Sequence, residues 1–135
     1  MRFKFFLLSF TYWWLYNQLF DENVEGKITA EIKSHKELND ELKVEGYSQE
    51  KIRHLLQTSS ILGILDERNF LKSKTALVDL GAGKGNLSYW LAKVIETEKL
   101  EDSKVLVIDR ASHRHKRDNV MKDTGIIDRI KVDIG

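Results

Sequence analysis

Apolar residues recur at helical spacing in two stretches of the first half of the chain. Between residues 28 and 42 they form a partial helical stripe, which Gly46 interrupts. Ser48 then supplies the hydroxyl of a helix N-cap, and Glu50 places an acid in the first turn. The pattern predicts two helices, the second ending near Asp66. Its buried face would be Ile52, Leu55, Leu56, Ser59, Leu62 and Leu65.

Three short apolar runs in the second half predict buried strands. The first covers residues 76–78, just before a glycine cluster, and the second covers residues 105–108 and ends at Asp109. The third alternates apolar and polar residues over 130–134 and includes Asp133. Each strand therefore has an acid at or near its carboxyl end.

A helix is predicted after each of the first two strands. Asn86 would cap the earlier helix, and the later one is polar, covers residues 113–123 and is closed by Gly125. The inner face of the earlier helix would be Leu87, Trp90, Leu91, Val94 and Ile95. Right-handed crossovers make this an α/β fold with a parallel sheet of strand order 3-2-1. In that arrangement one edge of residues 76–80 lacks a partner, which would be an aggregation hazard.

The first twenty residues differ from the rest in composition. They hold nine of the thirteen aromatic residues, and an apolar run from Phe5 to Phe20 follows Arg2 and Lys4. This resembles a signal peptide or anchor, but no small-residue cleavage site follows. Sixteen helical residues span about 24 Å, whereas a hydrocarbon core is about 30 Å thick. A membrane location is therefore not expected, and residues 1–26 are interpreted as a segment that is not native to the fold.

Overall composition excludes few classes of protein. The 135 residues carry a net charge of +1, so no global field draws the chain toward nucleic acid. The absence of cysteine excludes disulfides and thiolate zinc sites. The pair His113 and His115 has no evident further ligand, so no metal is expected in this chain.

The segment Gly81-Ala82-Gly83-Lys84-Gly85 joins the first strand to the helix that follows. Glycines there permit a tight turn and a close approach of backbone to a ligand. A P-loop needs Ser or Thr after the lysine, and a dinucleotide site needs glycine at position 86, which is Asn. Asp79, just before the glycines, suits a ligand with a cationic amine and no pyrophosphate. S-adenosylmethionine is such a ligand.

The acids at the ends of the other strands extend this candidate site. A carboxylate at Asp109 can accept hydrogen bonds from both ribose hydroxyls of a nucleoside, and Asp133 can accept one from an adenine amino group. One such acid alone would be an ordinary strand end facing solvent. Three at matching positions beside a glycine loop favour a ligand site at the carboxyl edge of the sheet.

These residues resemble the eukaryotic tRNA ribose 2′-O-methyltransferases that modify nucleotide 4 of the acceptor stem. The resemblance covers roughly residues 28–135. It rests on the run from Leu80 to Trp90, on residues 59–63 with 32–35, and on residues 107–134. It implies a partial Rossmann-like methyltransferase domain over residues 73–135, preceded by a helical segment over 27–72, in a cytoplasmic or nuclear protein. The implied S-adenosylmethionine site is Asp79, Gly81, Ala82, Gly83, Gly85, Asp109 and Asp133.

The resemblance also implies tRNA as a partner of the full-length protein. Arg110, Arg114, Lys116 and Arg117 follow the second strand and are candidates for contact with tRNA phosphates. A solvated helix face is an equally good interpretation of this cluster.

The chain departs from the family pattern in two ways. The family carries cysteine and histidine zinc modules, and its catalytic domain continues well beyond a third strand. We therefore expect a fragment that holds the methyl donor but is inactive alone, and no catalytic residue is assigned. The alternatives are a non-catalytic donor-binding fragment or another nucleotide-binding Rossmann-like protein.

Overall fold

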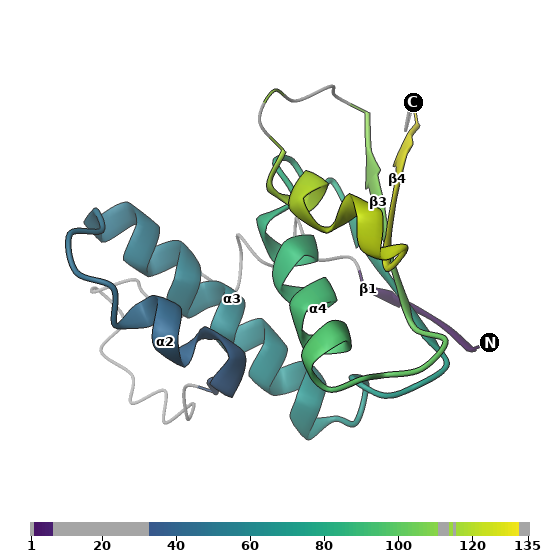
Figure 1. Ribbon diagram of the computed structural model, residues 1–135, viewed down its shortest axis with the longest axis horizontal. Helices are drawn as coiled ribbons and strands as arrows, with labels where there is room; N and C mark the ends of the chain where they lie inside the picture. Colours follow the sequence, from purple (N-terminus) through teal and green to yellow (C-terminus); the bar gives the residue numbers. More distant parts are fainter. Residues whose placement is uncertain (1, 7–32, 111–113, 115, 133–135) are drawn as a thin grey trace, which may run out of the picture.

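The computed structural model describes residues 2–6, 33–110, 114 and 116–132. Its centre is a four-stranded, all-parallel sheet in the order β1-β2-β3-β4 (Figure 1). The strands are β1 (Arg2–Phe6), β2 (Thr75–Leu80), β3 (Lys104–Asp109) and β4 (Ile127–Lys131). The predicted parallel arrangement of the last three strands, with the middle one between the others, is confirmed.

The edge of β2 that was expected to lack a partner is paired. β1 runs parallel to it, with Arg2 opposite Thr75 and Phe6 opposite Asp79. The expectation was wrong because it drew strands only from the region after residue 73. Any extended segment can satisfy the unpaired N–H and C=O groups of an apolar edge. β2 is therefore an inner strand, and all its residues up to Asp79 are buried.

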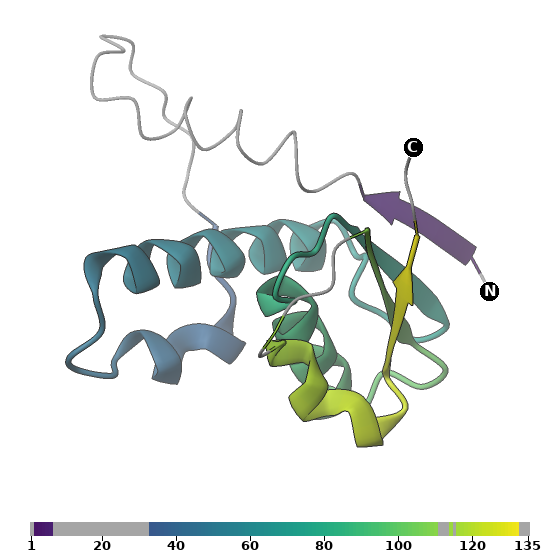
Figure 2. The ribbon, with the colours of Figure 1, turned by 90° about the horizontal axis from the view of Figure 1, so that it is seen from above.

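The helices lie in two groups beside the sheet. α4 (Asn86–Thr97) and the 3-10 helix η2 (Arg117–Thr124) cover one face of it, as Figures 1 and 2 show. The other group packs against α4 and comprises the 3-10 helix η1 (Lys36–Leu38), α2 (Asn39–Leu42) and α3 (Gln49–Glu67). One apolar core joins both groups to the sheet.

α3 follows its sequence pattern closely. The Ser48 hydroxyl accepts a hydrogen bond of 3.2 Å from the backbone N–H of Lys51, which confirms the predicted N-cap. Most of the predicted face is buried, but Leu56 is 46% exposed. Gly63 lets this helix approach the segment before η1, since an added Cβ would lie 2.8 Å from the carbonyl oxygen of Ser34.

α4 begins differently from the prediction. Asn86 is its first helical residue rather than its N-cap, and Gly85 takes the cap position with φ of 77° and no side-chain cap bond. The last glycine of the loop thus turns the chain directly into the helix. Four of the five predicted core residues are buried, namely Trp90, Leu91, Val94 and Ile95.

The last two elements are shifted relative to the prediction. The helix after β3 is a 3-10 helix that begins at Arg117, and Gly125 ends it with φ of 71°, as expected. Pairing with β3 starts at once, because the Val105 N–H donates to the carbonyl of Ile126 over 2.8 Å. β4 therefore starts before residue 130, and Ile127 rather than Ile130 is buried.

The described residues contain neither a helix that could span a membrane nor a cluster of metal ligands. No helix among them is long and apolar enough to cross a membrane. No group of three or more histidines and acids in this part of the chain is arranged to hold a metal ion.

Candidate functional site

The glycine loop after β2 has a left-handed backbone at three positions. Gly81, Gly83 and Gly85 have φ of 70°, 57° and 77°, in the left-handed region that disfavours residues with a side chain. The N–H of Gly81 donates to the carbonyl of Ile108 over 2.8 Å, which ties the loop to the end of β3. Ala82, between the first two glycines, is half-buried and packs against the core.

The glycines at 83 and 85 have opposite surroundings. A Cβ added to Gly83 would meet no atom within 4 Å, so the backbone there is open to an incoming group. A Cβ added to Gly85 would collide with the Asp118 carboxylate, whose Cγ lies 2.7 Å from it. The absence of a side chain at Gly83 thus leaves room for a ligand, whereas its absence at Gly85 leaves room for the Asp118 carboxylate.

Asp79 is buried beneath the loop. It is 4% exposed, and its Oδ2 accepts a hydrogen bond of 2.6 Å from the Ser88 hydroxyl on α4. Burial raises the pKa of Asp79, and the bond from Ser88 opposes that rise. Asp79 therefore links β2 to α4 through a buried hydrogen bond.

Asp109 closes β3 on the other side of the loop. Its Oδ2 accepts a hydrogen bond of 2.7 Å from the N–H of Gly83, and the residue is 8% exposed. The structure thus brings two of the three predicted acids to one edge of the sheet, on either side of the glycines. Asp133, the third, lies outside the described residues.

Sequence reasoning missed an ion pair beside the loop. Arg129 on β4 donates from Nε to Oδ2 of Asp118 over 2.9 Å and from Nη2 to Oδ1 over 2.8 Å. Its Nη2 also donates to the carbonyl of Gly83 over 3.2 Å. Asp118 is 2% exposed, and its hydrogen bonds raise the pKa of Arg129. Both residues fell within a stretch that carried the family resemblance, but no spacing rule pairs a strand arginine with an acid eleven residues earlier.

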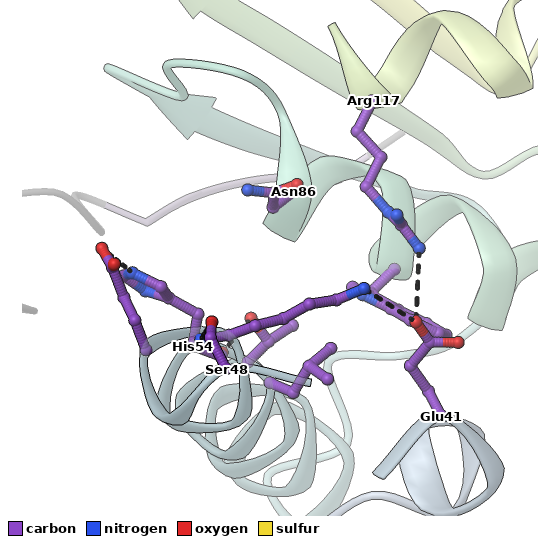
Figure 3. Close-up of a pocket in the computed structure, with 10 residues that line it drawn as sticks. Glu41, Ser48, His54, Asn86 and Arg117 are labelled. Atoms are coloured by element: carbon purple, nitrogen blue, oxygen red, sulfur yellow. Dashed lines mark hydrogen bonds and ion pairs between the residues drawn. The ribbon is translucent and has the colours of Figure 1, made fainter. Parts of the chain in front are cut away.

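A pocket of about 310 Å³ lies next to this loop, between α3, α4 and η2 (Figure 3). Asn86, directly after the glycines, and Arg117 line it, together with residues of α2 and α3. The Arg117 guanidinium lies 4.4 Å from the centre of the Tyr89 ring, and its Nη2 lies 3.9 Å from Oε1 of Glu41. None of the described residues that were predicted to bind S-adenosylmethionine lines this pocket.

The four basic residues after β3 are placed in different surroundings. Arg110 and Arg114 are exposed, whereas Lys116 and Arg117 are half-buried. Arg117 points into the pocket toward Glu41 (Figure 3), so these residues do not form one uniform solvated helix face.

Carboxylates accept hydrogen bonds from hydroxyl groups and attract positive charge. Two buried carboxylates flank the loop, and open backbone lies between them. The family model described as Methyltransferase TRM13 matches residues 56–135, a range that includes the glycine loop, both acids and the Arg129 pair. The chain belongs to the TRM13 methyltransferase family.

Curated TRM13 proteins match over a similar region. The mouse "tRNA:m(4)X modification enzyme TRM13 homolog" is 32% identical over 104 residues, which cover 76% of this chain and 21% of the mouse protein. The human protein of the same name is 31% identical over 83 residues, covering 61% of this chain and 17% of its own length. The chain thus spans about a fifth of the length of these TRM13 relatives. No solved structure matches it significantly.

Proposed function

We propose that this chain forms the donor-binding part of an S-adenosylmethionine-dependent tRNA 2′-O-methyltransferase that acts on nucleotide 4 of the acceptor stem. The parallel sheet would be the first half of a Rossmann-like methyltransferase domain. One observation carries the proposal: three left-handed glycines lie between the buried carboxylates of Asp79 and Asp109, within the range matched by the TRM13 family. The proposed donor site is Asp79, Gly81, Ala82, Gly83, Gly85, Asp109 and Asp133.

The residues present fit the chemistry of this donor. S-adenosylmethionine carries a sulfonium and an amine, and both are cationic, so nearby carboxylates favour it. The open face of Gly83 leaves room for a ligand against the backbone. A dinucleotide would instead bring an anionic pyrophosphate toward the same acids, which is unfavourable. Charge therefore favours the methyl donor over a nicotinamide dinucleotide.

Each part of the site has a proposed task. The donor, when bound, supplies an already activated methyl group, so the protein has mainly to align it with the acceptor oxygen. Asp109 accepts hydrogen bonds from the ribose hydroxyls, and Asp133 accepts one from the adenine amino group. Asp79 contributes negative potential from beneath the loop while it holds Ser88.

The tRNA contact is a proposal for the whole protein. Arg110, which directly follows β3, and Arg114 are exposed, so both can meet backbone phosphates. Binding through such contacts weakens as salt rises, because phosphate neutralisation releases counterions.

Isothermal titration of this chain with S-adenosylmethionine and with NAD tests the proposal. We expect binding of the methyl donor and none of NAD. Asp109→Asn should weaken donor binding by about tenfold or more, because hydrogen bonds to a charged group contribute about 1.5–3 kcal/mol. Asp128→Asn, which changes an exposed acid on β4, is the matched control and should leave binding unchanged. Binding of NAD without binding of the methyl donor would contradict the proposal.

A further inference from the structure

Arg129 contacts the glycine loop and a buried acid at the same time. We propose that Arg129, held by Asp118, is a positioning residue that fixes the shape of the glycine loop for the donor. The donor part of this inference rests on the function proposed above. The clamp itself, defined here as Asp118 and Arg129, rests only on geometry within the described residues.

The clamp and Asp109 hold the Gly83 residue from two sides. Its N–H donates to Asp109 over 2.7 Å, and its carbonyl accepts from Nη2 of Arg129 over 3.2 Å. Two residues on neighbouring strands thus fix both polar groups of the glycine whose open face is available to a ligand. A left-handed residue with no Cβ has wide conformational freedom, so such restraints decide which conformation it takes.

Two further contacts tie the loop to η2. The Asp118 carboxylate occupies the space in which a side chain at Gly85 would lie. The N–H of Arg117 donates to the carbonyl of Lys84 over 2.8 Å. Three consecutive loop residues, 83 to 85, therefore contact groups from η2 or β4. Those elements come more than 30 residues later in the sequence.

Arg129 also balances the charges around the loop. The carboxylates of Asp79, Asp109 and Asp118 all act on it electrostatically. Its bidentate bonds offset the charge of Asp118, the one of these three acids that is not a predicted donor residue. The clamp thus orders the loop through Asp118, which is not one of the proposed donor residues.

Replacement by lysine separates charge from geometry. Arg129→Lys keeps the positive charge, but an ammonium cannot reproduce the planar fork that reaches both oxygens of Asp118 and the Gly83 carbonyl. A role limited to charge balance would survive this change, whereas a positioning role would not.

Amide hydrogen exchange of the full chain at Gly83 and Gly85 provides a readout that needs no donor. In Arg129→Lys we expect both amides to exchange about tenfold faster, since the restraints lost are hydrogen bonds to charged groups. Lys104→Met is the matched control, because it removes an exposed ion pair of 3.3 Å that joins β3 to Asp128, the neighbour of Arg129 on β4. The control should leave exchange at both glycines unchanged. Asp118→Asn, which removes the charge from the other side of the clamp, should also accelerate exchange.

Titration with S-adenosylmethionine then tests whether the restraint serves binding. Arg129→Lys should weaken donor binding by about tenfold, with Lys104→Met equal to the wild type. Unchanged exchange in Arg129→Lys would overturn the clamp, and faster exchange with unchanged donor affinity would overturn its positioning role. A wild-type chain that binds no donor would refute the proposed function and the donor part of this inference. The exchange rates at Gly83 and Gly85 would still test whether the clamp restrains the loop.

Discussion

Substitution of single loop glycines by alanine should separate stability from binding. Gly85→Ala places a methyl group against the Asp118 carboxylate and keeps a left-handed φ of 77°. The backbone strain costs about 1–2 kcal/mol, and displacing the hydrogen-bonded carboxylate from Arg129 adds about 1.5–3 kcal/mol. Gly83→Ala incurs only the strain, because its Cβ would project into open space. The expected losses of unfolding free energy are therefore about 2.5–5 kcal/mol at Gly85 and about 1–2 kcal/mol at Gly83.

Urea denaturation of the two variants measures these losses. Gly125→Ala is the control, since it has a similar φ of 71°, no atom within 4 Å of its added Cβ and no place in the loop. Donor binding should weaken in both variants, because Gly85→Ala also displaces Asp118 from its clamp with Arg129. Gly83→Ala fills the open face and should weaken binding while it unfolds no more easily than Gly125→Ala. Equal destabilisation by Gly85→Ala and Gly83→Ala would refute the argument, because it would mean that Asp118 does not limit the space at Gly85.

Three further predictions concern the fold. Burial raises the pKa of Asp79 above its ordinary value of 3.8, so the folded chain binds a proton at this carboxylate more tightly than the unfolded chain does. The free energy of unfolding therefore falls as pH rises from 3.8 through the raised pKa. Asp79→Asn should therefore unfold at higher urea than the wild type at neutral pH, with the gain vanishing near pH 3.8; a constant gain at all pH values would exclude burial as its cause. Ser48→Ala should cost about 1 kcal/mol of unfolding free energy through the lost N-cap, whereas Ser73→Ala, at an exposed bend, should cost nothing measurable by the same titration. Deletion of residues 1–6 should expose the apolar edge of β2 and promote association, seen by light scattering, and a deletion variant that stays monomeric would argue against that pairing.

Elements with a local cause were predictable from the sequence. The N-cap at Ser48 and the termination of η2 at Gly125 depend on side chains next to the element they bound. β2 and β3 were found because runs of apolar residues next to glycine or acid leave few alternatives. The two acids at the sheet edge followed from the rule that parallel strands end on the same side.

What the sequence did not predict depends on contacts distant along the chain. The start of β4 is fixed by its register with Val105 on β3, not by the alternation of its own residues. The exposure of Leu56 depends on which neighbours cover α3. The pairing of Arg129 with Asp118 requires η2 and β4 to meet at the glycine loop, which no local pattern encodes.

The pairing of β1 with β2 has a consequence for the order in which the chain assembles. Thr75 lies 73 residues after its partner Arg2, whereas β2, α4 and β3 follow one another closely. At about 5–20 residues per second of ribosomal synthesis, the first strand waits several seconds before its partner is made. The contact also closes the longest loop of the sheet, which makes it the entropically most expensive pairing. We expect β1 to add last to a nascent sheet built from its later strands.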